Sequence, residues 1–207
     1  MPTQPVHDLV IHPRENDLVV GTHGRGFFIT DISPLQELTG SVLELNVHLF
    51  TIEPKVQWVI PSQKVVSAQN FAGPNEPYGI VVNYYLKNRV NSEVKITVYQ
   101  GTRAINEIMG TNNSGLNSVE WNMTKRRERT ESEIALWQLD QNERDFYVDE
   151  EESFHSYDEV DYHRIANNDP KFINFPVQPG EYAIALTVDG QVLKRNAVIL
   201  QDHWYDK

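Results

Sequence analysis

The strongest constraint on the fold is an alternation of apolar side chains at every second position, which recurs along the second half of the chain. It is present in four runs: Ile80, Val82, Tyr84 and Leu86; Val94, Ile96 and Val98; Val119, Trp121 and Met123; Tyr182, Ile184, Leu186 and Val188. Because successive side chains of a strand point to opposite faces, this period indicates strands with one buried face. Asp189-Gly190, after the last run, is a favoured two-residue hairpin turn. We therefore predict an all-β fold, built mainly as an antiparallel β-sandwich.

A second group of short strands is predicted in residues 1–32. Apolar residues alternate with their neighbours in three runs, which contain Leu9 and Ile11, Leu18 and Val20, and Phe27 and Ile29. Turn-forming residues separate the three runs. Three strands of this size form a small antiparallel meander. Such a meander buries too little apolar surface to be stable alone. We therefore expect that the chain is part of a larger protein, or that the meander docks on the remainder of the chain.

The sequence divides into a meander (1–32), a linker or short helix (33–50) and the sandwich (51–207), with a charged insertion at 125–173. Thr130 and Glu133 have the spacing of a capping box, which predicts a helix running to about Phe146. Ile134 and Trp137 share one face of that helix. We expect Trp137 to anchor the helix on the sandwich or the meander, and a partner surface is the alternative.

Composition excludes several classes of function. The net charge of −11 argues against a nucleic-acid partner, since phosphate binding depends on clustered lysine and arginine. The absence of cysteine excludes disulfides, thiolate metal sites and cysteine nucleophiles. No apolar run approaches the ~20 residues of a membrane helix, so we expect no membrane span.

The opening residues resemble a known family. Val6-His-Asp-Leu-Val-Ile-His-Pro, followed by Gly21-Thr22-His23-Gly24-Arg25-Gly26, is similar to the last blade of sortilin-like, BNR-repeat β-propellers, which are often labelled as glycosyl hydrolases. The resemblance covers residues 5–32. It implies an upstream propeller domain of the same protein as the partner, and a secreted or periplasmic location. The glycines suit tight turns with positive φ.

The sandwich resembles a second family. The runs from Glu93 to Tyr99, Gly115 to Asn122 and Val177 to Gly190 are similar to the immunoglobulin-like domain of flagellar hook-capping proteins and of many secreted bacterial modules. This resemblance covers most of residues 78–200. It implies an immunoglobulin-like sandwich with a binding or scaffolding role.

Four residues are candidates for ligand binding. His23 and Arg25 would line the central funnel of a propeller, or else be solvated turn residues. Tyr157 and Tyr162 would offer stacking platforms for a sugar ring, or else fix the acidic segment in place. The sequence leaves these alternatives open.

No catalytic residue, metal site or cofactor is predicted. The acids at 149–152 and 158–161 lack the alternating spacing of a calcium loop, and the seven histidines lack metal-ligand spacing. No pair of opposed carboxylates for glycoside hydrolysis can be recognised.

We therefore expect a non-catalytic module that supports the propeller or binds a glycan or a protein. The alternatives are a part of a glycoside hydrolase whose catalytic residues lie mainly upstream, and a structural assembly or sorting domain. Homodimerisation through exposed strand edges is a further alternative.

Overall fold

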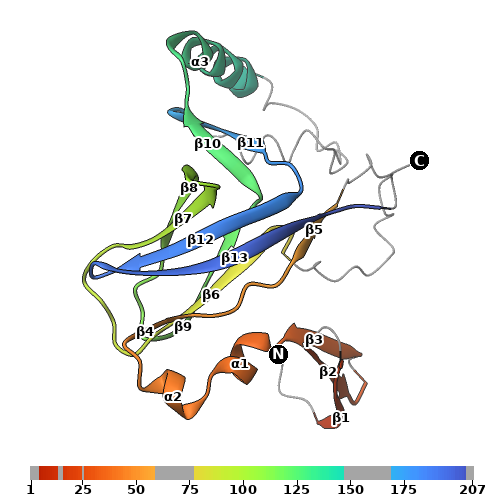
Figure 1. Cartoon of the computed structure of the whole chain (residues 1–207). Coiled ribbons are helices and arrows are strands. Elements are labelled where there is room, and N and C mark those ends of the chain that lie inside the picture. The colour runs from red at the N-terminus through yellow and green to blue at the C-terminus, as the bar shows by residue number, and fades with distance from the viewer. Residues whose placement is uncertain (1–4, 14–15, 25, 59–76, 147–168, 204–207) are drawn as a thin grey trace.

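The structure is a computed structural model, which describes residues 5–13, 16–24, 26–58, 77–146 and 169–203, with side chains from Asp140 to Phe146 left out. It confirms the all-β prediction: in these described residues, strands in several antiparallel sheets dominate, with three short helices (Figure 1). The strands are β1 (Val6–Ile11), β2 (Asp17–Thr22), β3 (Phe27–Asp31), β4 (Val47–Leu49), β5 (Lys55–Gln57), β6 (Ile80–Leu86), β7 (Val94–Gln100), β8 (Arg103–Gly110), β9 (Gly115–Trp121), β10 (Thr124–Glu128), β11 (Phe172–Pro176), β12 (Gly180–Val188) and β13 (Gln191–Gln201). The helices are α1 (Ser33–Glu37), α2 (Gly40–Leu43) and α3 (Glu131–Phe146).

Two sheets form the sandwich. The first has five strands in the order β5-β13-β12-β7-β8, and the second has three in the order β4-β6-β9. All neighbours are antiparallel except β5, which pairs parallel with the end of β13. The predicted hairpin turn joins β12 to β13, with positive φ at Asp189 and Gly190.

The core lies between these sheets and contains the residues that the alternation predicts. All four predicted inward positions of β6 are buried, and so are the three of β7. Trp121, at the end of β9, is fully buried, and its ring contacts Tyr182 edge to face at 5.3 Å. The Trp121 indole N–H donates to the carbonyl oxygen of Thr124 at 2.8 Å. The largest core side chain is thus both packed and hydrogen-bonded.

The first strand of the sandwich lies within the segment 33–50 of the sequence division. Val47 and Leu49 are buried in β4, which pairs with β6. Both side chains belong to the core cluster of the sandwich. The preceding residues form α1 and α2, with the Thr39 hydroxyl accepting from the Val42 N–H at the start of α2.

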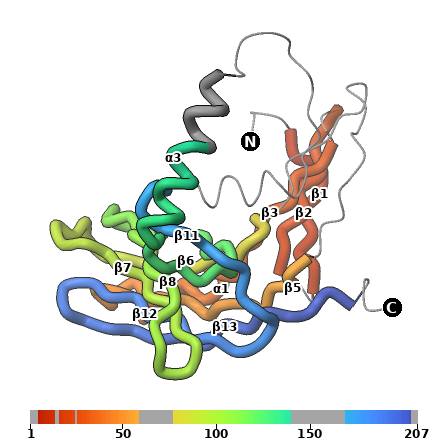
Figure 2. Tube along the Cα trace, turned by 90° about the horizontal axis from the view of Figure 1, so that it is seen from above, coloured from red at the N-terminus to blue at the C-terminus, as the bar shows by residue number. Residues whose placement is uncertain are grey.

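The insertion starts with a two-stranded ribbon that the sequence did not predict. β10 pairs antiparallel with β11, and α3 follows β10. The chain turns out of β9 at Met123, which is fully buried and has a φ of 50°, a conformation that costs a non-glycine residue energy. The predicted helix is confirmed as α3, and it stands out from the sandwich (Figure 2).

Candidate functional site

The meander β1–β3 has apolar side chains on both faces. Paired residues of neighbouring strands lie on the same face, so the registers Leu9↔Val20↔Phe28 and Val10↔Val19↔Ile29 define the two faces. The first face carries Leu9, Ile11, Leu18, Val20 and Phe28, and the second carries Val10, Val19, Phe27 and Ile29. Strands that are apolar on both faces are typical of sheets covered on both sides.

These faces are largely open to solvent. Phe27 is 69% exposed, Leu9 59% and Ile29 57%, and only Val20 in the central strand is buried, at 7%. The core cluster of the sandwich contains none of the meander residues. Figure 1 shows the meander as a separate small sheet beside α1. Because exposed apolar patches are often interaction surfaces, the two faces of the meander are the candidate site of this chain.

Of the four predicted site residues, the structure describes one. His23 is exposed in the turn between β2 and β3, and its ring stacks on that of His7 at 5.0 Å. Arg25, Tyr157 and Tyr162 lie outside the described residues, so their roles in binding stay predictions.

Sequence reasoning missed half of the apolar surface. The alternation indicates Leu9 and Ile11, whereas Val10 between them belongs to the opposite face. The signal was available in the uninterrupted runs 9–11, 18–20 and 27–29, since strands buried on both faces have no alternation.

A hydrogen-bonded joint connects the meander to the sandwich through α1. The Glu37 carboxylate accepts from the backbone N–H of Thr51 at 2.9 Å, and its other oxygen lies 2.8 Å from Nε2 of His48. The Ser33 hydroxyl donates to Glu53 at 2.9 Å. Burial by itself raises the pKa of Glu37, yet the hydrogen bonds from Thr51 and His48 outweigh it and hold the pKa below its ordinary value. Glu37 is therefore an ionised tether between α1 and the sandwich.

Replacing Glu37 with alanine is expected to loosen this joint. The Thr51 N–H loses a charged acceptor, so its hydrogen exchange, followed by NMR, should become about tenfold faster. The matched control is Glu44→Ala in the residue that follows α2, because the Glu44–Lys87 pair is solvent-exposed. An unchanged Thr51 rate in Glu37→Ala would show that the carboxylate does not hold α1.

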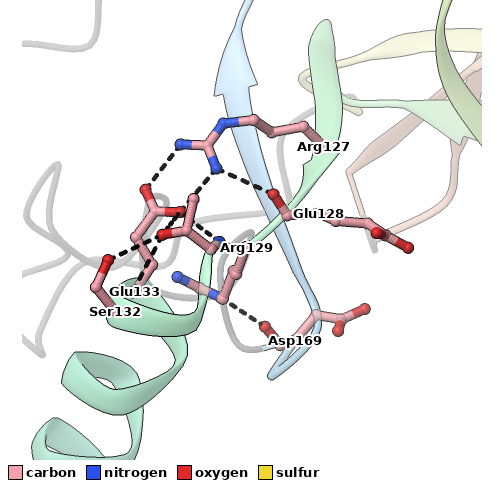
Figure 3. A network of polar contacts seen from close by, with 7 residues as sticks. Arg127, Glu128, Arg129, Ser132, Glu133 and Asp169 are labelled. Carbon is pink, nitrogen blue, oxygen red and sulfur yellow. Dashed lines mark hydrogen bonds and ion pairs between the residues drawn. The ribbon is translucent and has the colours of Figure 1, made fainter.

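A charged network fixes the base of the insertion (Figure 3). The Arg127 guanidinium forms a bidentate ion pair with the Glu133 carboxylate, with N···O distances of 2.8 and 2.7 Å. The same carboxylate accepts from the Thr130 N–H at 2.9 Å, which completes the predicted capping box. Asp169, which precedes β11, joins the network through two arginines. Its carboxylate forms an ion pair with Arg126 at 2.6 Å, and its carbonyl oxygen accepts from Nε of Arg129 at 3.1 Å. The network sets the direction in which α3 leaves the ribbon.

We expect the contact between Arg127 and Glu133 at the start of α3 to persist at low pH. The Arg127 guanidinium, followed by the Thr130 N–H, lowers the pKa of Glu133 to about 2. A carboxyl group with a lowered folded-state pKa contributes stability above its unfolded pKa and loses it as the pH falls through the folded value. The contact should therefore persist until the pH approaches 2, as an NMR titration of the Glu133 carboxyl carbon would show.

The matched variants for this titration are Arg127→Ala and Arg126→Ala. Arg127→Ala should move the pKa of Glu133 back toward its ordinary value, and Arg126→Ala should leave it low. Equal titration in all three proteins would contradict the pairing of Arg127 with Glu133.

The described part of the chain contains no group of three metal-ligating side chains close enough to hold an ion. Within those same residues, no helix has the length and apolarity to cross a membrane. Comparison with protein-family models found no match, and comparisons with curated proteins and with solved structures also found none.

Proposed function

We propose that this chain is a non-catalytic scaffolding module, in which the sandwich is a stable base and the meander docks against neighbouring β-sheets of an adjoining domain. One observation carries the proposal: the meander is apolar on both faces, and both faces expose large apolar side chains. A sheet of this kind needs a cover on each side, as the blade of a β-propeller has.

The form of the meander supports a propeller as the adjoining domain. The turn between β2 and β3 has Gly24 and Gly26 at φ values of 75° and 78°, the left-handed conformation for which glycine is suited. These glycines belong to the segment 21–26, whose pattern resembles that of sortilin-like, BNR-repeat blades. An upstream propeller domain of the same, exported protein is accordingly the proposed partner.

Four carboxyl groups of the described residues have structural contacts in place of the properties of a catalytic acid. Glycoside hydrolysis needs an acid whose pKa is raised so that it can deliver a proton. Four described carboxyl groups instead have a lowered pKa and are hydrogen-bonded within the fold: Glu37, Glu44, Glu133 and Asp169. In the alternative of a glycoside hydrolase, these four groups would not supply the proton-donating acid.

The test compares this chain with a longer polypeptide that includes whatever the gene encodes upstream of Met1. Blade-like repeats should be found there, and hydrogen exchange of residues 5–31, followed by mass spectrometry, should be about 100-fold slower in the longer protein. Residues 180–188 in the sandwich serve as the internal control and should not change. Equal exchange of the meander in both proteins, or an upstream sequence without repeats, would overturn the proposal.

A further inference from the structure

The outer edge of β3 presents a regular row of backbone groups. The β2–β3 ladder has a backbone hydrogen bond at each end. The Thr22 N–H donates to the Gly26 carbonyl at one end, and the Ile32 N–H donates to the Asn16 carbonyl at the other. Hydrogen-bonded and non-bonded pairs alternate in an antiparallel ladder, so the register places three residues of β3 at non-bonded positions. Their N–H and C=O groups point away from β2: Phe27, Ile29 and Asp31. No described strand pairs with this edge.

The outer edge of β1, in contrast, is protected. The hydrogen bond from His12 N–H to the Asp17 carbonyl sets its ladder, which turns the N–H groups of Leu9 and Ile11 outward. The Asp8 carboxylate occupies the Leu9 N–H at 2.9 Å, and a bulge interrupts the register between Val6 and Asp8. Charges and bulges are the devices with which proteins block strand edges. β3 has neither device between Phe27 and Thr30.

A charge at the end of β3 indicates the chemistry of its partner. Asp31 lies directly opposite Asp17, and like charges in this position destabilise a sheet. The Ser33 N–H, at 2.8 Å from Oδ1, holds the Asp31 side chain in place. A basic side chain in an added strand would relieve this repulsion. A second copy of the chain is disfavoured as the partner because each copy has a net charge of −11.

We propose that the outer edge of β3 is a docking edge for an extended, antiparallel strand that has apolar side chains beside Phe27 and Ile29 and a lysine or arginine beside Asp31. Pairing adds backbone hydrogen bonds along the edge, and the alternate side chains supply specificity. The inference rests on the proposed function in one respect, since the covering β-sheet domain is taken as the source of the strand.

The test uses the full chain and a synthetic peptide with blocked ends, Thr-Lys-Thr-Val-Thr-Val-Thr, which places lysine beside Asp31 and valines beside Ile29 and Phe27. At millimolar peptide, NMR-detected hydrogen exchange of the Ile29 and Asp31 amides should slow about tenfold, while that of Ile11 should not change. A peptide with glutamate in place of lysine should bind about threefold more weakly.

Two variants separate edge pairing from other binding. Ile29→Pro removes an outward N–H and no β2–β3 hydrogen bond, so it should abolish the protection, whereas the matched change Ile11→Pro on the opposite edge should not. Asp31→Asn keeps the acceptor for Ser33 and should remove the preference for lysine over glutamate.

Three results would overturn the inference: no protection of β3 at the solubility limit of the peptide, protection of Ile11 instead, or self-association through β3 without peptide. A negative result here leaves the proposed function standing if the whole meander is still protected in the longer polypeptide, because coverage of the faces would slow exchange throughout β1–β3 and not only at the outer amides of β3. Conversely, peptide pairing without protection in the longer polypeptide would remove the proposed function, and with it the covering domain as the source of the strand, but would leave β3 as a docking edge.

Discussion

Replacing Trp121 with alanine is expected to lower the free energy of unfolding by about 3–5 kcal/mol, the usual cost of deleting a large aromatic side chain from a packed core. Among the residues that the structure describes, Trp121 is the largest fully buried side chain, and it lies between the two sheets against Tyr182. The variant also loses the hydrogen bond to the Thr124 carbonyl, which holds the corner where β9 leads into β10. We therefore expect a lower urea midpoint and increased exposure of the ribbon.

The matched control is Leu116→Ala, in the same strand. Leu116 is exposed, so its loss should change the free energy of unfolding by no more than about 0.5 kcal/mol. Urea denaturation followed by fluorescence of the remaining tryptophans measures both variants. Comparable stabilities of Trp121→Ala and Leu116→Ala would show that Trp121 is not part of the packed core.

The second large effect is expected at Gly79, where alanine should destabilise the protein by about 1–3 kcal/mol through overpacking. An added Cβ would clash with the backbone carbonyl of Trp121 and lie 2.8 Å from Cγ of Glu120. The Gly79 N–H also donates to the Glu120 carboxylate at 2.7 Å, so Gly79 cannot move away without losing that bond.

Gly40→Ala is the control for Gly79→Ala. A Cβ at Gly40 would meet nothing within 4 Å, and the residue begins α2, where alanine is favoured over glycine. We expect Gly40→Ala to be neutral or slightly stabilising in thermal unfolding. A melting temperature of Gly79→Ala as high as that of Gly40→Ala would contradict the close approach of residue 79 to β9.

Periodicity predicted the sandwich well because burial on one face leaves a direct trace in the sequence. Ile80, Val82 and Leu86 alternate with half-buried positions and lie in the core, as expected. The Asp189-Gly190 turn and the Thr130–Glu133 capping box were likewise predictable, since each depends on residues close in sequence.

Features that join distant residues could not be predicted. The tether from Glu37 to His48 and Thr51 depends on how α1 sits against β4, and no local pattern marks it. The β10–β11 ribbon pairs residues about fifty positions apart, because Thr124 lies opposite Pro176. Trp137 is half-buried in α3 and is not part of the core cluster, so its predicted anchoring stays a prediction.

The meander shows why the candidate site was only partly recognised. Its strands were predicted from the alternation of Leu18 and Val20, but the apolar Val19 between them lies on the opposite face, beside Ile29. An apolar residue at a position where the alternation predicts a polar one indicates that the second face of the sheet is also covered. The resemblances to propeller blades and to hook-capping sandwiches stay predictions, and the proposed docking role rests on the two apolar faces.

Native-state hydrogen exchange of this chain alone tests the central claim most directly. Val20 and Leu186 both lie in central strands with neighbours on each side, and both are buried. If the meander lacks the cover that it needs, the Val20 amide should exchange through local opening at a free energy several kcal/mol below that of Leu186, which should require global unfolding. Equal protection of the two amides, with the same dependence on denaturant, would show that the meander is already stabilised within this chain and would contradict the account.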